Sequence, residues 1–169
     1  VTPMPGAPSA SLRAEPTTVI RDYTTEIRLI WETERADTVT LFLDQPLTVE
    51  SSGERVVSAP SFDRTYVLQA EGAGGRMEDR ASVTVEDAGC TVVFNAPLNL
   101  RSGPGTDYDP PITSVDPDTQ VEPLGYYAGG FPEPGWFYVR VLGTGETGWV
   151  RDANGAYVNC NVESDDLPE

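Results

Sequence analysis

The sequence predicts an all-β protein built from two small domains. Short stretches in which apolar and polar residues alternate recur along the 169 residues, and alternation of this kind indicates strands with one buried face. The 16 Gly and 15 Pro are spread between these stretches, as expected for the turns of a β protein. No helical period or internal repeat stands out. The length fits one large domain or two small ones.

The N-terminal half begins with a proline-rich segment and continues as short strands. Residues 1–10 contain three prolines and little that can pack, which is typical of a linker or an extended arm. Strands are expected at 26–31, 38–43, 65–70 and 82–86. About seven short strands between residues 11 and 87 would make a β-sandwich.

The order of Pro60 and the strand at 65–70 resembles the tyrosine-corner strand of immunoglobulin-like domains. This resemblance covers residues 11–87 and implies an immunoglobulin-like β-sandwich with Trp31 and Tyr66 in its core. Three apolar residues fall on the outward phase of their strands: Ile30, Phe42 and Val67. They are either scattered surface residues or a packing surface against the second domain or another subunit.

After a short joint at 87–89, the C-terminal half carries the most specific motif of the chain. Residues 98–108 read Leu-Asn-Leu-Arg-Ser-Gly-Pro-Gly-Thr-Asp-Tyr, and residues 148–150 read Gly-Trp-Val. Strands are expected at 91–94, 98–101, 119–123, 136–141, 148–150 and 157–158. This order and spacing resemble the bacterial SH3 domain, a small extracellular β-barrel that binds or assembles and rarely catalyses. The resemblance covers residues 90–160 and leaves 161–169 as an acidic tail.

The resemblance also implies candidate ligand-binding residues. In such domains the aromatic residues beside the long loop line a peptide or glycan groove, which here gives Tyr108, Trp136, Tyr138 and Trp149. The alternative for Tyr108 and Trp149 is a place in the barrel core. An insertion at 126–135 departs from the family and adds Tyr126, Tyr127 and Phe131, as a separate binding loop or as a lid over the groove.

The two cysteines, Cys90 and Cys160, lie at the ends of the SH3-like segment. A disulfide between them would clamp the first and last strands of the barrel, and the alternative is a buried pair of free thiols. A disulfide implies an exported, oxidised location, extracellular or at the cell surface. The chain begins on Val1 rather than Met, so we expect that a leader has been removed. No apolar stretch is long enough to span a membrane.

Composition excludes several function classes. The net charge is −16, with 27 acidic residues against 11 Arg and no Lys, so nucleic acids are not expected as partners, and teichoic acids and anionic lipids would be repelled. There is no His, which removes the usual general base and the commonest metal ligand. We therefore expect no catalytic residues, no metal site and no cofactor. The acidic clusters do not match an EF-hand loop, and calcium binding stays open.

Two functions remain. The first is a non-catalytic extracellular binding module, in which the SH3-like barrel holds a cell-envelope peptide, glycan or protein and the immunoglobulin-like domain is a spacer. The second is a structural subunit of an extracellular filament or surface layer, assembled by strand or arm exchange between copies.

Overall fold

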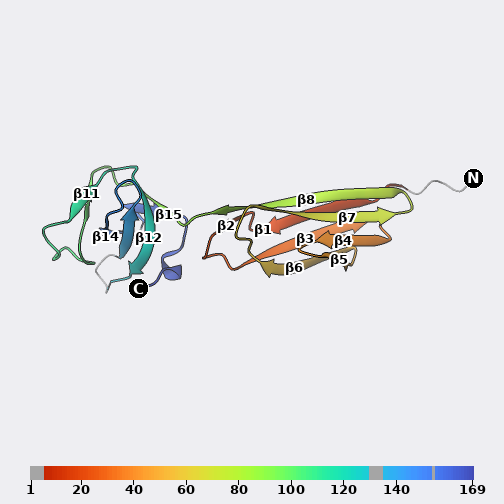
Figure 1. Ribbon diagram of the computed structural model, residues 1–169, viewed down its shortest axis with the longest axis horizontal. Coiled ribbons are helices and arrows are strands. Elements are labelled where there is room, and N and C mark those ends of the chain that lie inside the picture. The colour runs from red at the N-terminus through yellow and green to blue at the C-terminus, as the bar shows by residue number, and fades with distance from the viewer. Residues whose placement is uncertain (1–5, 130–134, 154) are drawn as a thin grey trace, which may run out of the picture. The chain divides into compact units, whose positions relative to one another are not determined.

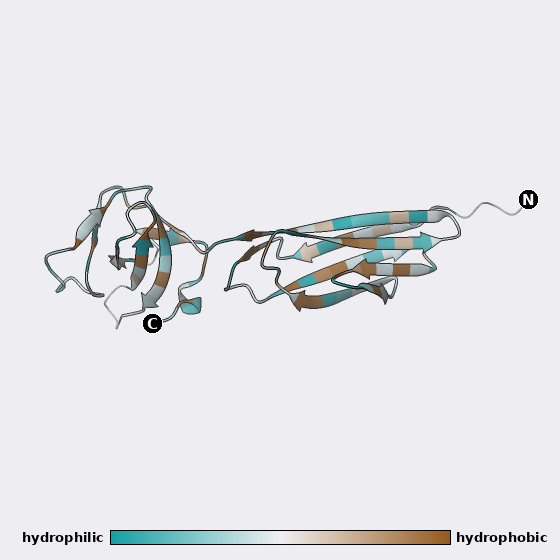
Figure 2. Cartoon of the chain, viewed as in Figure 1, coloured by the Kyte–Doolittle hydropathy of each residue, from teal (hydrophilic) through white to brown (hydrophobic). Residues whose placement is uncertain are grey.

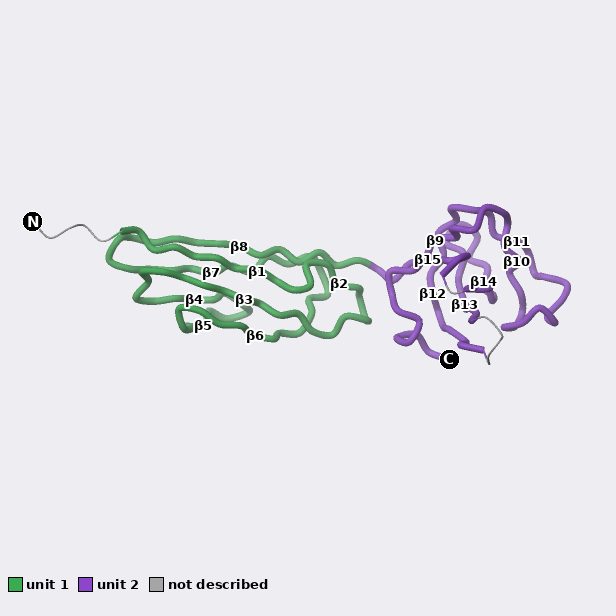
Figure 3. The backbone as a smooth tube through the Cα atoms, turned by 180° about the vertical axis from the view of Figure 1, so that it is seen from behind, with its two compact units in different colours: residues 1–86 green, residues 87–169 purple. Residues whose placement is uncertain are grey.

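The computed structural model describes residues 6–129, 135–153 and 155–169. In this part of the chain the regular secondary structure is β-strand, apart from one short 3-10 helix, η1 (Ser164–Asp166). The all-β prediction is confirmed. The chain divides into two compact units, 1–86 and 87–169 (Figure 3). Each unit has its own sheets.

The described part of unit 1, residues 6–86, contains eight strands in two sheets. Figure 1 labels these strands. The three-stranded sheet has the order β1-β3-β6, and the five-stranded sheet has the order β2-β8-β7-β4-β5. The strands are β1 (Ser9–Glu15), β2 (Thr18–Ile20), β3 (Glu26–Glu34), β4 (Thr38–Phe42), β5 (Pro46–Val49), β6 (Ser52–Ser58), β7 (Arg64–Gly72) and β8 (Gly75–Glu86).

Alternation along these strands creates a single core between the two sheets. Hydrophobic and hydrophilic residues alternate along the strands in Figure 2, and the buried apolar side chains of both sheets form one cluster. Trp31 and Tyr66 are both buried in this cluster, as the sequence predicted. The Trp31 indole N–H donates to the Glu50 carbonyl at 2.9 Å, so the polar edge of this core residue is satisfied.

The first strand passes from one sheet to the other at a proline. β1 pairs with β3, whereas β2 pairs in parallel with the end of β8. Pro16 lies between them and has no N–H to continue the ladder. In the middle of β1 the Asp79 carboxylate accepts the Leu12 N–H at 2.7 Å, so a side chain of β8 satisfies a backbone donor of β1.

The described end of the N-terminal segment is part of unit 1. β1 begins at Ser9, inside the stretch expected as an arm. Just before it, the Ala7 carbonyl accepts a 2.9 Å hydrogen bond from Arg35 Nε. Residues 1–5 lie outside the described residues.

Seven strands lie within the described residues of unit 2, which are 87–129, 135–153 and 155–169. A five-stranded sheet has the order β14-β13-β12-β9-β15, and β10 pairs with β11. The bounds are β9 (Cys90–Val92), β10 (Leu98–Leu100), β11 (Thr113–Val115), β12 (Gln120–Tyr127), β13 (Trp136–Val141), β14 (Thr147–Arg151) and β15 (Val158–Cys160). An antiparallel bridge between Arg101 and Trp149 joins the smaller sheet to β14. Val121, Val139 and Val150 are fully buried in this unit.

The acidic C-terminal segment packs onto unit 2. Leu167 is buried, and the Pro168 carbonyl accepts the Tyr126 N–H at 2.8 Å. β9 pairs with β12 only at Gln120 and Val121, so the Tyr126 N–H would otherwise lack a strand partner on that side. The segment therefore covers an open edge of β12.

Candidate functional site

One arginine determines the conformation of the loop that follows β10. The Arg101 side chain is only 12% exposed and donates to Asp109 Oδ1 at 2.9 Å, to the Tyr108 carbonyl at 3.0 Å and to the Thr106 carbonyl at 3.4 Å. A Cβ on Gly103 would overlap the Tyr108 ring, so this ring closes over the turn. Arg101 therefore holds the loop in shape from inside it, and its charge is compensated by Asp109.

A cavity of about 200 Å³ opens between this segment and the ends of β13 and β14. Its lining is assembled from four parts of unit 2 that are far apart in the sequence. The lining residues are Pro97, Leu98, Asn99, Arg101, Thr106, Trp136, Arg151 and Tyr157. The lining thus combines apolar and aromatic walls with an amide and two guanidinium groups.

Strand register explains why these side chains meet. Trp136 and Arg151 are directly paired across β13 and β14, so both point to the same face of the sheet. Trp136 is 4% exposed and forms a wall, whereas Arg151 is exposed. The Arg151 guanidinium lies 5.9 Å from the centroid of the Tyr157 ring, and that ring in turn contacts Phe94 at 4.3 Å between centroids.

Of the seven candidate ligand-binding residues, only Trp136 lines this cavity among the described residues. Tyr138 and Trp149 face each other across β13 and β14 with their rings 5.2 Å apart. Tyr108 and Tyr127 are exposed, at 47% and 46%. Phe131 lies outside the described residues.

Tyr126 belongs to a polar network at the end of the sheet. Its hydroxyl donates to Asp152 Oδ2 at 3.1 Å, and its ring packs on Phe137 with centroids 4.8 Å apart. The other carboxylate oxygen of Asp152, which is buried, accepts the Gly155 N–H at 2.8 Å. Burial, followed by the negative charge of Asp152, raises the pKa of Tyr126 above its usual value of 10.0.

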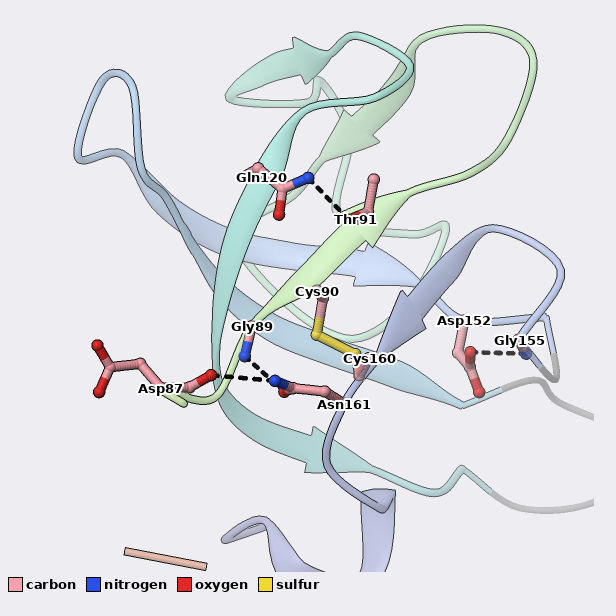
Figure 4. The surroundings of a disulfide bond; sticks show 9 residues. All are labelled: Asp87, Gly89, Cys90, Thr91, Gln120, Asp152, Gly155, Cys160 and Asn161. Atoms are coloured by element: carbon pink, nitrogen blue, oxygen red, sulfur yellow. Dashed lines mark hydrogen bonds between the residues drawn. A yellow bond between two sulfur atoms is a disulfide. The ribbon is translucent and has the colours of Figure 1, made fainter. Parts of the chain in front are cut away.

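The predicted disulfide between Cys90 and Cys160 is confirmed (Figure 4). The two residues are partners in the register of β9 and β15, with their Cα atoms 4.0 Å apart. The Asn161 side chain reinforces this clamp, because its amide donates to the Asp87 carbonyl at 3.0 Å and its oxygen accepts the Gly89 N–H at 2.8 Å. The start and the end of unit 2 are thus tied both covalently and by hydrogen bonds.

The three outward apolar residues of unit 1 lie on different sheets. Phe42 and Val67 are direct partners across β4 and β7, and Phe42 is 37% exposed. Ile30 lies on β3 in the other sheet, opposite Glu54. Phe42 and Val67 therefore form a pair, and Ile30 is separate from it.

Sequence reasoning did not single out Arg151, Tyr157, Asn99 or Pro97. The available signal was the position of Arg151 directly after the Gly-Trp-Val run, because that position pairs it with Trp136. Within residues 6–129, 135–153 and 155–169, no cluster of His, Cys, Asp or Glu side chains is arranged to hold a metal ion, and no helix is long and apolar enough to cross a membrane.

Comparison with known proteins gives one family match. Residues 96–159 match the family model described as the bacterial SH3 domain. No curated protein matches the chain. The match lies within unit 2, so the family of the N-terminal β-rich unit is not named by it. A bacterial SH3 domain indicates a binding module, typically one that binds cell wall, and together with the disulfide it is consistent with an extracellular, cell-envelope location.

Proposed function

We propose that this chain is a non-catalytic extracellular interaction protein whose SH3 domain binds a cell-envelope peptide, glycan or protein through the cavity beside the Arg101 loop. Unit 1 then serves as an immunoglobulin-like spacer. The proposal rests on the cavity lining. Its aromatic residues are Trp136 and Tyr157, and its polar side chains include Asn99 and Arg151. Few polar groups set among apolar walls are typical of ligand sites.

A pelleting assay on insoluble cell-wall material tests this proposal. Asn99 is exposed on β10 and lines the cavity, so Asn99→Arg should obstruct the cavity without removing core packing. Asn159→Arg is a matched control, because Asn159 is exposed on β15 and does not line the cavity. Both variants add the same charge to an acidic protein.

We expect the unaltered chain and Asn159→Arg to sediment with the wall material, and Asn99→Arg to stay in the supernatant. Equal sedimentation of the two variants would place binding elsewhere on the protein. No sedimentation of the unaltered chain would contradict wall binding itself.

A second candidate function is a structural subunit of an extracellular filament or surface layer. The Phe42–Val67 pair on the outer face of the five-stranded sheet supports it, because the two side chains are adjacent apolar residues on a face where another copy could pack. Negative-stain microscopy of the purified chain distinguishes the two. Regular polymers that Phe42→Glu abolishes would favour the subunit, and a monodisperse monomer would contradict it.

A further inference from the structure

The cavity of unit 2 differs in charge from the rest of the protein. The chain carries a net charge of −16, and residues 87–169 contain three arginines, Arg101, Arg140 and Arg151. Two of them, Arg101 and Arg151, line this cavity, and no acidic side chain among the described residues does. Because Asp109 compensates the charge of Arg101, Arg151 is the group that makes this cavity cationic on an otherwise acidic domain.

The two arginines are in different states. Arg101 is enclosed by its own loop and is paired with Asp109 at 2.9 Å. Arg151 is exposed, and in the described part of the chain its guanidinium has an aromatic neighbour, Tyr157, but no carboxylate within ion-pair distance. By contrast, Arg140 on the neighbouring strand is paired with Glu122 at 2.6 Å. Arg151 is the charged group of the cavity that is available to a ligand.

The size of the cavity limits what it can hold. At about 200 Å³ it is smaller than the roughly 300–1,000 Å³ of sites that enclose a whole drug-sized ligand. It suits the end of a chain, such as a terminal carboxylate and one small side chain. Pro97 and Leu98 offer apolar contact to such a side chain, and the Asn99 amide offers both a donor and an acceptor to a peptide bond.

We propose that this cavity binds the free carboxylate end of a short peptide, with Arg151 as the partner of the carboxylate. This inference rests on the proposed binding function and names its ligand class. A guanidinium pairs with a carboxylate through two parallel N–H···O bonds, which fixes the orientation of the ligand end. Long polyanions are disfavoured, because most of their charges would lie outside the cavity and be repelled by the acidic surface around it. The ligand class is therefore a peptide terminus and not an anionic polymer.

The probes are N-acetyl-alanyl-alanine with a free carboxylate and the same peptide with a C-terminal amide. Each is titrated into the full-length ¹⁵N-labelled chain, and the signals of the Asn99 side chain, the Trp136 indole and the Arg151 backbone amide are followed. We expect the carboxylate form to shift these signals and to bind about three- to ten-fold more tightly than the amide. Arg151→Gln should remove this difference, whereas Arg140→Gln, which loses the same charge from a pair outside the cavity, should keep it.

The outcomes separate this inference from the proposed function. In one outcome the two peptides bind equally well while Asn99→Arg still abolishes sedimentation with wall material. That result would overturn the carboxylate assignment but would still support the binding-module proposal. Retention of the carboxylate preference in Arg151→Gln would also overturn it. Absence of any shift with either peptide would overturn the assignment, and absence of wall sedimentation as well would contradict both proposals.

Discussion

Reduction of the Cys90–Cys160 disulfide should destabilise unit 2 and leave unit 1 unaffected. The bond closes a loop with a sequence separation of 70 residues, which contains nearly all of unit 2 and none of unit 1. Chain-entropy relations assign about 4 kcal/mol to a loop of this length. Domains of this size have a total stability of about 4–12 kcal/mol, so the loss is a third of the total or more.

Urea unfolding of the oxidised and reduced forms measures this effect. Cys90 is 1% exposed, so the bond must be reduced in urea and the protein refolded in reductant. The three Trp give separate reporters, because Trp31 lies in unit 1 whereas Trp136 and Trp149 lie in unit 2. Their indole signals in ¹⁵N-labelled protein follow the two transitions independently.

With a urea dependence of about 1 kcal/mol per molar, we expect the unit 2 midpoint to fall by about 4 M on reduction. The unit 1 midpoint should not move, which makes it an internal control. A unit 2 shift corresponding to less than about 1 kcal/mol would refute the reasoning that loop closure stabilises the barrel. Equal shifts of both transitions would show instead that the units do not unfold separately.

Three smaller perturbations test other parts of unit 2. Gly103→Ala should lower the free energy of unfolding by about 1 kcal/mol and displace the Tyr108 ring, because a Cβ at this position would overlap that ring. Gly105→Ala is the control: a Cβ there meets no atom nearer than 3.5 Å, so the urea midpoint should not change. The pKa of Tyr126 is raised in the folded state, so its neutral hydroxyl stabilises unit 2 below pH 10, and this stabilisation is lost as the pH rises through the folded-state pKa. The urea midpoint of unit 2 should therefore fall in this pH range. The fall should be smaller in Tyr126→Phe. Leu167→Ala should cost about 2 kcal/mol and speed hydrogen exchange of the Tyr126 amide, and unchanged exchange would mean that the segment does not protect this edge.

Strands with strict alternation were the most predictable elements of the fold. The run at 136–141 matches β13 in both bounds, because its apolar residues recur with period two and its neighbours are Gly-rich. β5 and β6 were not identified from the sequence. Both are edge strands that leave most of their residues exposed or only partly buried, so apolar and polar residues alternate less clearly along them. β11 was missed for a similar reason, as a three-residue strand shows too little of any period.

The candidate site was less predictable than the fold. Trp136 could be predicted from its position in the family pattern. The other lining residues come from separate segments, and which of their side chains face the cavity depends on how the strands pair. Arg151 faces the cavity because it is the partner of Trp136 across β13 and β14, and a shift of one residue would turn it to the opposite face. Tyr126 and Trp149 carry the same aromatic signal as Trp136, yet one bonds to Asp152 and the other packs on Tyr138.

The residues that tie the ends of unit 2 together differ from those that line its proposed binding cavity, so the stability prediction and the binding proposal can be tested independently. The clamp of Cys90, Cys160 and Asn161 ties the ends of the unit and lines no part of the cavity. Arg151 lies at the cavity and is exposed, so its loss removes little packing. Reduction should therefore abolish binding only where it unfolds unit 2, whereas Arg151→Gln should weaken peptide binding at an unchanged urea midpoint. If Arg151→Gln lowered the urea midpoint of unit 2 and weakened peptide binding to a similar degree, this arginine would stabilise the fold rather than contact the ligand.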